Sequence, residues 1–365
     1  ATTEIYTLSL HDALPISKID VDNQSIGTMT KPRYVPIAEG KDYYIYNLIE
    51  ELDSQNEFYF DKDSGILYLI PYDTDLKEDT FKNVSVQIPV INQPILSLNN
   101  AENLEFKNIV FENSNNALIS VLDSKNCAFR GCTARNAGDT GIEVKGNATK
   151  NVTVDSCDVY KTGSYGISIN NVGDKQNLIS ADVLVTNCKI YDTSITYRTN
   201  TPALNMTGVG ITASHNQIFN MPHIAFKFHG VRIYFEYNEV FNSLTDGAHD
   251  AGTMHNGRRI TNEDSEVRYN YFHNLNPNSL AVLYEDDHNP CHKIHGNIFY
   301  KTGRAVFIHG GRYNDVYNNI MIYPSREDAA MVGFQTASKY TWDPDTKASI
   351  NCDWAWWNDM CKLDA

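Results

Sequence analysis

The chain has 365 residues, 42% of them hydrophobic, and a formal net charge of −15 at pH 7. This charge argues against a nucleic-acid ligand and fits a polyanionic substrate poorly, so a neutral ligand is favoured. No run of 18 apolar residues occurs, and the sequence predicts no membrane span. The seven cysteines show neither a CxxC pair nor a zinc-like Cys/His spacing, which makes a disulfide framework the less favoured interpretation.

Residues 1–16, ATTEIYTLSLHDALPI, match no neighbouring pattern and look like a one-frame translation of a sequencing-library adapter. We interpret them as a non-native segment and exclude them from fold prediction. If so, a signal peptide preceding the natural chain would be lost from this sequence. Residues 336–365 form a C-terminal tail that is Trp-rich and has no evident capping element, as in a truncated chain.

Residues 17–100 are expected to form a β-rich capping region. Within it, residues 47–52 predict a short helical turn. Residues 57–60 and 66–70 alternate apolar and polar side chains around Asp63, Ser64 and Gly65, which is a hairpin signature. A solenoid end exposes unpaired backbone and needs such a cap.

Residues 101–335 repeat with spacings of about 22 to 32 residues and predict an all-β, right-handed parallel β-helix of about 9–11 coils. Segments such as NCAFRGCTARN, DVLVTNCKIYD and RIYFEYNEVFN place Asn or Cys in one register. That column is Asn108, Cys132, Cys157, Cys188, Asn216, Asn238, Asn270, Asn297 and Asn319. Two positions later comes an apolar column of Val110, Ala134, Val159, Ile190, Ile218, Val240, Phe272, Phe299 and Met321.

Stacked parallel strands lie about 4.8 Å apart, so the asparagine amides of one column can hydrogen-bond along the stack. Cysteine is small and readily buried, and we interpret the three cysteines of the column as core rather than redox groups. The column is therefore scaffolding, and its value is the register that it sets.

A second strand recurs in GIEVKG, GISINN, ALNMTG, AFKFHG, TMHNGR, VLYEDD and AVFIHG. Its inward positions are Ile142, Val144, Ile167, Ile169, Leu204, Met206, Phe226, Phe228, Met254, Leu283, Val306 and Ile308. Strand alternation turns two further columns outward. They are Glu143, Ser168, Asn205, Lys227, His255, Tyr284 and Phe307, and Lys145, Asn170, Thr207, His229, Gly257, Asp286 and His309.

From Lys227 onward the outward columns concentrate His, Tyr, Phe and Asp, which is typical of a saccharide groove. A face with an ordinary polar mixture is the alternative. Five histidines fall on these coils, His223, His229, His249, His255 and His309. No ligand-like His and carboxylate spacing accompanies them, so we expect hydroxyl-binding histidines and no metal. Arg258, Arg304 and Arg312 either bind an anionic substituent or pair with aspartates in turns.

Carboxylates cluster in LTDGAHDAG, with Asp246 and Asp250, and in LYEDDHN, with Glu285, Asp286 and Asp287. On neighbouring coils we expect such groups 5–10 Å apart, the range in which two carboxylates cleave a glycosidic bond. The alternatives are a calcium site, which no further ligand pattern indicates, and turn caps.

These motifs, with NLIEELDSQNEFYFDKDSGILYLIP, TYRTNTPALNMTGVG, DAGTMHNGR and HGNIFYKTGRAVFIHGGR, resemble β-helix carbohydrate-active proteins similar to glycoside hydrolase family 141, over residues 34–323. The resemblance implies extracellular or periplasmic glycan breakdown, with fucosidase and xylanase activities known. It places catalytic aspartates at Asp250 and at Asp286 or Asp287, and the column phase favours Asp286. His255 and Glu285 depart from the family pattern.

The preferred prediction is a secreted, periplasmic or cell-surface glycoside hydrolase, monomeric and without a cofactor, acting on a plant or algal glycan. Its substrate is a polysaccharide or oligosaccharide. The expected substrate-binding residues are Lys227, His229, His255, Tyr284, Glu285, Phe307, His309, Arg258, Arg198 and Tyr197. A polysaccharide lyase acting on a uronate polymer and a non-catalytic glycan-binding surface protein are the alternatives.

Overall fold

The computed structural model describes residues 4–7, 13–29, 43–61, 63–71, 87–247, 250–257, 261–286, 289–325 and 330–333. The chain divides into two compact units, Ala1–Ile88 and Pro89–Ala365. Throughout these described segments, no helix is long and apolar enough to cross a membrane.

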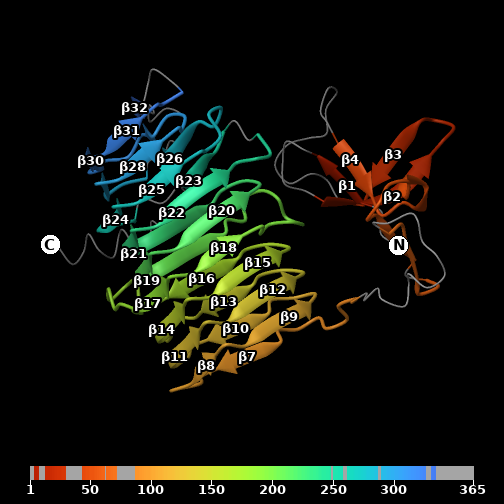
Figure 1. Ribbon diagram of the computed structural model, residues 1–365, viewed down its shortest axis with the longest axis horizontal. Coiled ribbons are helices and arrows are strands. Elements are labelled where there is room, and N and C mark those ends of the chain that lie inside the picture. Colours follow the sequence, from red (N-terminus) through yellow and green to blue (C-terminus); the bar gives the residue numbers. More distant parts are fainter. Residues whose placement is uncertain are drawn as a thin grey trace, which may run out of the picture. The chain divides into compact units, whose positions relative to one another are not determined.

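The first unit contains a small antiparallel sheet with the strand order β3-β2-β1-β4 and a separate hairpin of β5 and β6 (Figure 1). The predicted hairpin is confirmed, since Phe58 pairs with Leu69 and Gly65 takes a left-handed φ of 71° in the turn. The predicted helical turn is the 3-10 helix η1. The bounds are β1 Glu4–Thr7, β2 Ala13–Asp20, β3 Ser25–Thr28, β4 Tyr43–Tyr46, η1 Ile49–Glu51, β5 Phe58–Asp61 and β6 Ile66–Leu69.

Two expected boundaries differ from the structure. Strand β1 and the first half of β2 lie within residues 1–16, which we expected to stay outside the fold. The solenoid begins at Leu96 rather than at residue 101, because β7 already pairs with β10 of the next coil. The adapter origin of residues 1–16 and the capping role of this unit stay predictions.

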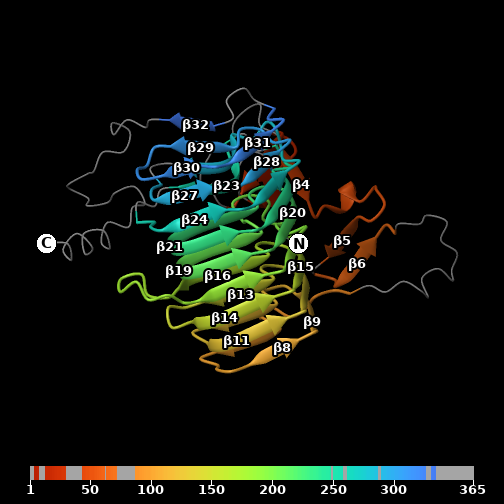
Figure 2. The ribbon, with the colours of Figure 1, turned by 60° about the vertical axis from the view of Figure 1, so that its left-hand side comes forward.

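The second unit is the predicted parallel β-helix, and three ladders of strands run along it. We name them ladders A, B and C. Figure 2 shows the strands of ladders A and B stacked from β8 to β32. Ladder A comprises β7 Leu96–Asn99, β10 Ile119–Leu122, β13 Ile142–Lys145, β16 Ile167–Val172, the first parts of β19 Leu204–Ser214 and β21 Phe226–Glu236, β23 Gly252–Gly257, β26 Ala281–Asp286, β29 Val306–His309 and β32 Ala330–Gly333.

Ladder B comprises β8 Glu105–Lys107, β11 Lys125–Arg130, β14 Lys150–Asp155, β17 Val183–Thr186, the second parts of β19 and β21, β24 Ser265–Arg268, β27 His292–His295 and β30 Asp315–Tyr317. Ladder C comprises β9 Val110–Ser114, β12 Thr133–Ala137, β15 Asp158–Thr162, β18 Lys189–Tyr191, β20 Gln217–Met221, β22 Glu239–Ser243, β25 Tyr271–His273, β28 Ile298–Tyr300 and β31 Ile320–Ile322. Ladders A and B join because β19 and β21 run through both.

The asparagine ladder is confirmed at the turn from ladder B to ladder C. Asn216 N–H donates to Asn238 Oδ1 at 2.9 Å, and Asn238 N–H donates to Asn270 Oδ1 at 2.9 Å. Cysteine takes the same role in the early coils, where Cys157 N–H donates to Cys188 Sγ at 3.4 Å. The described cysteines are all free thiols.

In the first coil, the predicted asparagine-or-cysteine column is wrong by one residue. Thr133 pairs with Val110, so Cys132 lies opposite Ile109, and the buried Phe111 replaces Val110 in the apolar column. Asn108 belongs to the preceding column instead, where one residue of every coil is left-handed: Asn108, Gly131, Ser156, Asn187, His215, Tyr237, Tyr269, Gly296 and Asn318. Asn and Gly tolerate that conformation, which explains the misleading asparagine.

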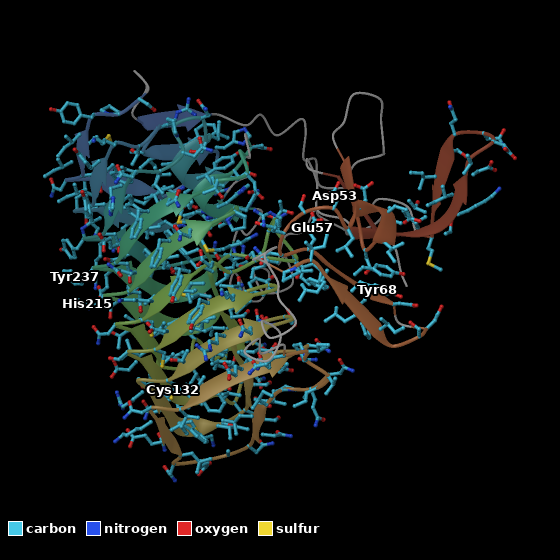
Figure 3. All side chains as sticks on the ribbon, turned by 45° about the vertical axis from the view of Figure 1, so that its right-hand side comes forward. Asp53, Glu57, Tyr68, Cys132, His215 and Tyr237 are labelled. Carbon is cyan, nitrogen blue, oxygen red and sulfur yellow. The ribbon has the colours of Figure 1, made fainter. Side chains whose placement is uncertain are left out.

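Rings also stack along these columns. His215 and Tyr237, which lie side by side in Figure 3, have centroids 5.1 Å apart. On the outer side of ladder C, Tyr191 and Phe219 stack at 4.7 Å, and Phe219 and Phe241 at 4.8 Å. The spacing between successive coils therefore brings rings of one column into stacking contact.

Candidate functional site

The outer face of ladder A carries the two predicted outward columns. Asn205 pairs with Lys227, His255 with Tyr284, and Tyr284 with Phe307. In the second column Gly257 pairs with Asp286, whose neighbour in the next coil is His309. The inward prediction also holds, because Phe226, Met254 and Leu283 are fully buried.

Asp286 ends strand β26 and is surrounded by donors from three coils. Its Oδ1 accepts the Tyr284 hydroxyl at 2.7 Å and lies 3.0 Å from His309 Nδ1, while Oδ2 lies 3.3 Å from His255 Nε2. Burial alone raises the pKa of Asp286, but the hydrogen bonds from His255, His309 and Tyr284 outweigh it and hold the pKa well below its usual range. Asp286 is therefore ionised at neutral pH.

The aromatic rings around Asp286 form a continuous stack. His255 stacks on Tyr284 at 4.6 Å, and Tyr284 stacks on Phe307 at 5.2 Å. Tyr284 is 3% exposed and Phe307 is 7% exposed, and the Arg304 guanidinium lies over the Phe307 ring at 5.1 Å. The expected open aromatic platforms are therefore wrong for these two rings, which are buried.

Gly257 keeps space beside Asp286. A Cβ at this position would lie 3.0 Å from the Asp286 carbonyl oxygen and 3.1 Å from its Cβ, which is tighter than ordinary contact. A side chain at this position would therefore press on Asp286.

Glu285 does not bind substrate from the outer face, contrary to the sequence-based expectation. The strand alternation turns it inward, where its side chain is fully buried and its Oε1 lies 2.7 Å from the equally buried His292 Nδ1. Its second oxygen accepts the Asn289 amide. A buried carboxylate with these partners is a structural group of the coil that carries Asp286.

Asn289 belongs to a second asparagine pair that the sequence analysis missed. Asn262 Nδ2 donates to Asn289 Oδ1 at 2.6 Å, and Asn262 Oδ1 accepts Gly230 N–H at 2.8 Å. These residues support the corner between ladders A and B, where Asp286 lies. Asn262 and Asn289 each precede a ladder asparagine, Asn270 or Asn297, by eight positions, and that repeat could have revealed them.

Asp250 lies at the opposite end of ladder A from Asp286. It is exposed and precedes β23, where the Ala251 carbonyl accepts Leu280 N–H at 3.1 Å. Leu280 and Asp286 are six residues apart along one extended segment, which separates them by roughly 20 Å. The expected 5–10 Å spacing of Asp250 and Asp286 is therefore wrong: their motifs are on neighbouring coils, but at opposite strand ends.

A separate group gathers near the amino-terminal ends of the ladder A strands. Arg198 makes a bidentate contact with Asp246, with Nε 2.6 Å from Oδ2 and Nη2 2.7 Å from Oδ1. The adjacent Tyr197 is half exposed. The predicted site residues thus fall at two ends of one face.

The remaining predicted residues divide into two sets. Lys227 and His229 lie on the outer side of β21 and are partly buried. Asp287, Arg258 and His249 lie outside the described residues.

The comparisons with known proteins match the fold. The family model described as "Right handed beta helix region" matches residues 44–181 and 147–321. No curated protein matches the sequence. A solved structure titled "Glycoside hydrolase" aligns with a TM-score of 0.64 and 14% identity, covering 92% of this chain and 70% of that chain.

Two further structures align with lower scores. The A-module of the Azotobacter vinelandii mannuronan C-5 epimerase AlgE4 has a TM-score of 0.47 at 10% identity, covering 64% of this chain and 62% of that chain. The Streptococcus pneumoniae surface protein and adhesin PfbA has a TM-score of 0.25 at 10% identity, covering 68% and 83%. With a family model matching most of its length and the predicted ladders observed, the chain belongs to the right-handed β-helix family.

Proposed function

We propose that the protein is a glycoside hydrolase that acts on a plant or algal glycan at the outer face of ladder A. The observation that carries the proposal is the arrangement of His255, His309 and Tyr284 around the two carboxyl oxygens of Asp286. The structural similarity to a protein titled "Glycoside hydrolase" and the resemblance to family 141 support the same class.

Hydrolysis of a glycosidic bond needs a proton for the leaving oxygen and a nucleophile or an activated water. Asp286 remains ionised, so it takes the second role, as nucleophile or as base. Proton donation falls to His255 or His309, which contact Asp286 and are partly exposed, with 19% and 31% of their side chains accessible.

Asp250 has a different part in this proposal. Roughly 20 Å from Asp286 along the strand direction, it cannot act on the same bond. We assign it, with Tyr197 and Arg198, to binding sugar units distant from the cleaved bond. The substrate is then an oligosaccharide or polysaccharide that runs along the direction of the ladder A strands.

The test is a screen of polysaccharides and nitrophenyl glycosides, followed by kinetics of Asp286→Asn and Asp250→Asn on the best substrate. Asp286→Asn should lower kcat by about 10²–10⁴-fold. Asp250→Asn should mainly raise KM. Circular dichroism checks that both variants are folded.

Retained turnover in folded Asp286→Asn would remove the proposal. An ultraviolet-absorbing unsaturated product would instead indicate a lyase. Glycan binding with no turnover of any substrate would indicate a non-catalytic binding protein.

A further inference from the structure

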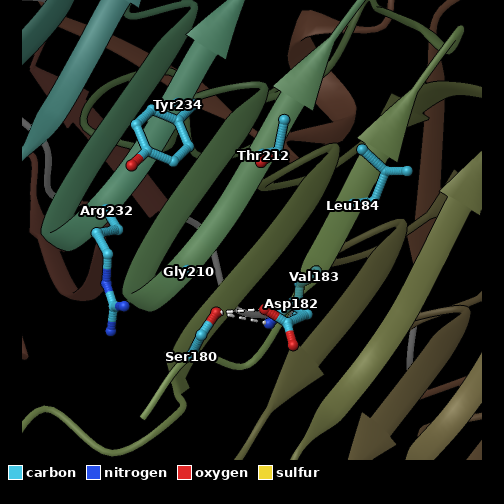
Figure 4. Close-up of a pocket in the computed structure, with 8 residues that line it drawn as sticks. All are labelled: Ser180, Asp182, Val183, Leu184, Gly210, Thr212, Arg232 and Tyr234. Atoms are coloured by element: carbon cyan, nitrogen blue, oxygen red, sulfur yellow. Dashed lines mark hydrogen bonds between the residues drawn. The ribbon is translucent and has the colours of Figure 1, made fainter. Parts of the chain in front are cut away.

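A depression of about 330 Å³ opens on the outer side of ladder B, away from Asp286 (Figure 4). Three neighbouring coils supply its walls, through β17, β19 and β21. Its volume is at the lower end of the range for small-ligand sites. The residues that line it are Ser180, Asp182, Val183, Leu184, Gly210, Thr212, Arg232 and Tyr234.

One wall of the depression contains a glycine in a column of left-handed residues. Asp182, Gly210 and Arg232 occupy equivalent positions in successive coils and have φ values of 52°, 72° and 53°. Gly210 has no side chain, and the Ser180 hydroxyl occupies the place that a Cβ would take.

The floor is an apolar stripe. Leu184, Thr212 and Tyr234 pair in register and face outward, as Figure 4 shows. The Arg268 guanidinium lies 5.2 Å from the centroid of the Tyr234 ring and packs against it. A ring fixed in this way next to a leucine and a threonine methyl offers a rigid apolar surface.

The rim is polar and already oriented. Asp182 Oδ1 accepts the Ser180 hydroxyl at 2.5 Å, and Asp182 Oδ2 lies 2.5 Å from Lys150 Nζ. The Lys150 ammonium and the Ser180 hydroxyl hold the pKa of Asp182 below its usual value. Arg232 donates to the Leu178 carbonyl, and within the described part of the chain its guanidinium makes no other hydrogen bond.

We propose that this depression is a subsite for one neutral sugar unit of a glycan. The apolar face of the sugar packs on Leu184, Thr212 and Tyr234, and its hydroxyls bond the guanidinium of Arg232 and the carboxylate of Asp182. The net charge of −15 disfavours a uronate or a sulfated sugar.

The proposal rests on the proposed function for its ligand class, but it requires no catalysis. Strand β21 carries both His229, on the outer face of ladder A, and Arg232 at this rim. A glycan bound along the ladder A strands is therefore within three residues of the depression. The subsite would bind a sugar unit of that chain at a distance from the bond that is cleaved.

The test is binding of wild-type protein to an array of neutral and acidic glycans, followed by calorimetry with the best ligand. Tyr234→Ala removes the floor, and Thr212→Tyr fills the depression without removing a rim contact. Each should weaken binding by about tenfold or more, equal to about 1.4 kcal/mol. The matched control is Tyr313→Ala, at a tyrosine that is 77% exposed outside the depression. It should bind like wild type.

The proposal fails if the wild-type protein binds no glycan, if acidic glycans bind better than neutral ones, or if the two folded variants bind as tightly as the control. Asp286→Asn separates the two proposals. If Asp286→Asn turns over substrate while Tyr234→Ala weakens binding, the hydrolase mechanism is lost and the subsite stands. If Asp286→Asn is inactive and Tyr234→Ala binds normally, the reverse holds.

Discussion

Replacing Asn238 by alanine tests the asparagine ladder that sets the register of the coils. Asn238 is 1% exposed and its side chain makes four hydrogen bonds. Its Oδ1 accepts Asn216 N–H at 2.9 Å and Asn216 Nδ2 at 3.0 Å. Its Nδ2 donates to Ala213 O at 3.0 Å and Asn270 Oδ1 at 3.1 Å.

The expected loss of stability depends on which hydrogen bonds the partners of Asn238 keep. The amide of Asn216 still donates to Val185 O, and Asn270 Oδ1 still accepts the backbone N–H of residue 238. The Asn216 backbone N–H loses its partner inside the core, which costs about 1–3 kcal/mol, and the other three bonds contribute about 0.5–1.5 kcal/mol each. Asn238→Ala should therefore reduce the free energy of unfolding by roughly 2.5–7.5 kcal/mol.

The assay is urea unfolding followed by circular dichroism, with Asn205→Ala as the matched control. Asn205 lies on the outer face of ladder A, where its amide bonds Asn170 Oδ1 at 3.0 Å at the solvent boundary. Removal of the Asn205 amide should reduce the free energy of unfolding by less than about 1 kcal/mol. Asn238→Cys should recover part of the loss, because Cys188 accepts a backbone N–H in the same column. Equal unfolding midpoints for the two alanine variants would refute the reasoning.

Three further predictions concern Asp286. Tyr284→Phe removes a hydrogen bond that lowers the pKa of Asp286, so the acid limb of the kcat/KM profile should move to higher pH; an unmoved limb would contradict this. Gly257→Ala should displace Asp286 and lower kcat by about tenfold or more with little change in unfolding midpoint, since a misplaced catalytic group is costly; unchanged kinetics would count against the packing argument. The folded pKa of Asp286 is below its unfolded value, so its stabilisation is complete above about pH 4 and is lost as pH falls further. The stability gap between wild type and Asp286→Asn should narrow in acid unfolding, and a constant gap would refute it.

The repeat made much of the solenoid predictable. A parallel β-helix places equivalent residues of successive coils in contact, so a column such as Asn216, Asn238 and Asn270 is visible in sequence because each member needs the next. The inward and outward columns of ladder A followed from strand alternation. The first coil failed because Asn108 satisfies a left-handed turn rather than the ladder, and both positions favour asparagine.

The candidate site was predictable only in part. The columns correctly placed His255, Asp286 and His309 on one face, and they already aligned Gly257 with Asp286. Asp250 and Asp286 were correctly assigned to neighbouring coils. That assignment did not reveal that they lie at opposite ends of the strands. Alternation also implied that Glu285 is buried, but its acidic side chain suggested the surface.

Only the tertiary structure decided what lies around each side chain. Residues from different coils, at their actual distances, decide the burial of Tyr284 and Phe307 and the Glu285 contact with His292. The same holds for the depression on ladder B. Sequence periodicity fixes which residues share a column, because each coil repeats the same backbone path. It does not fix the sizes and charges that meet across neighbouring coils, and those decide which groups form a site.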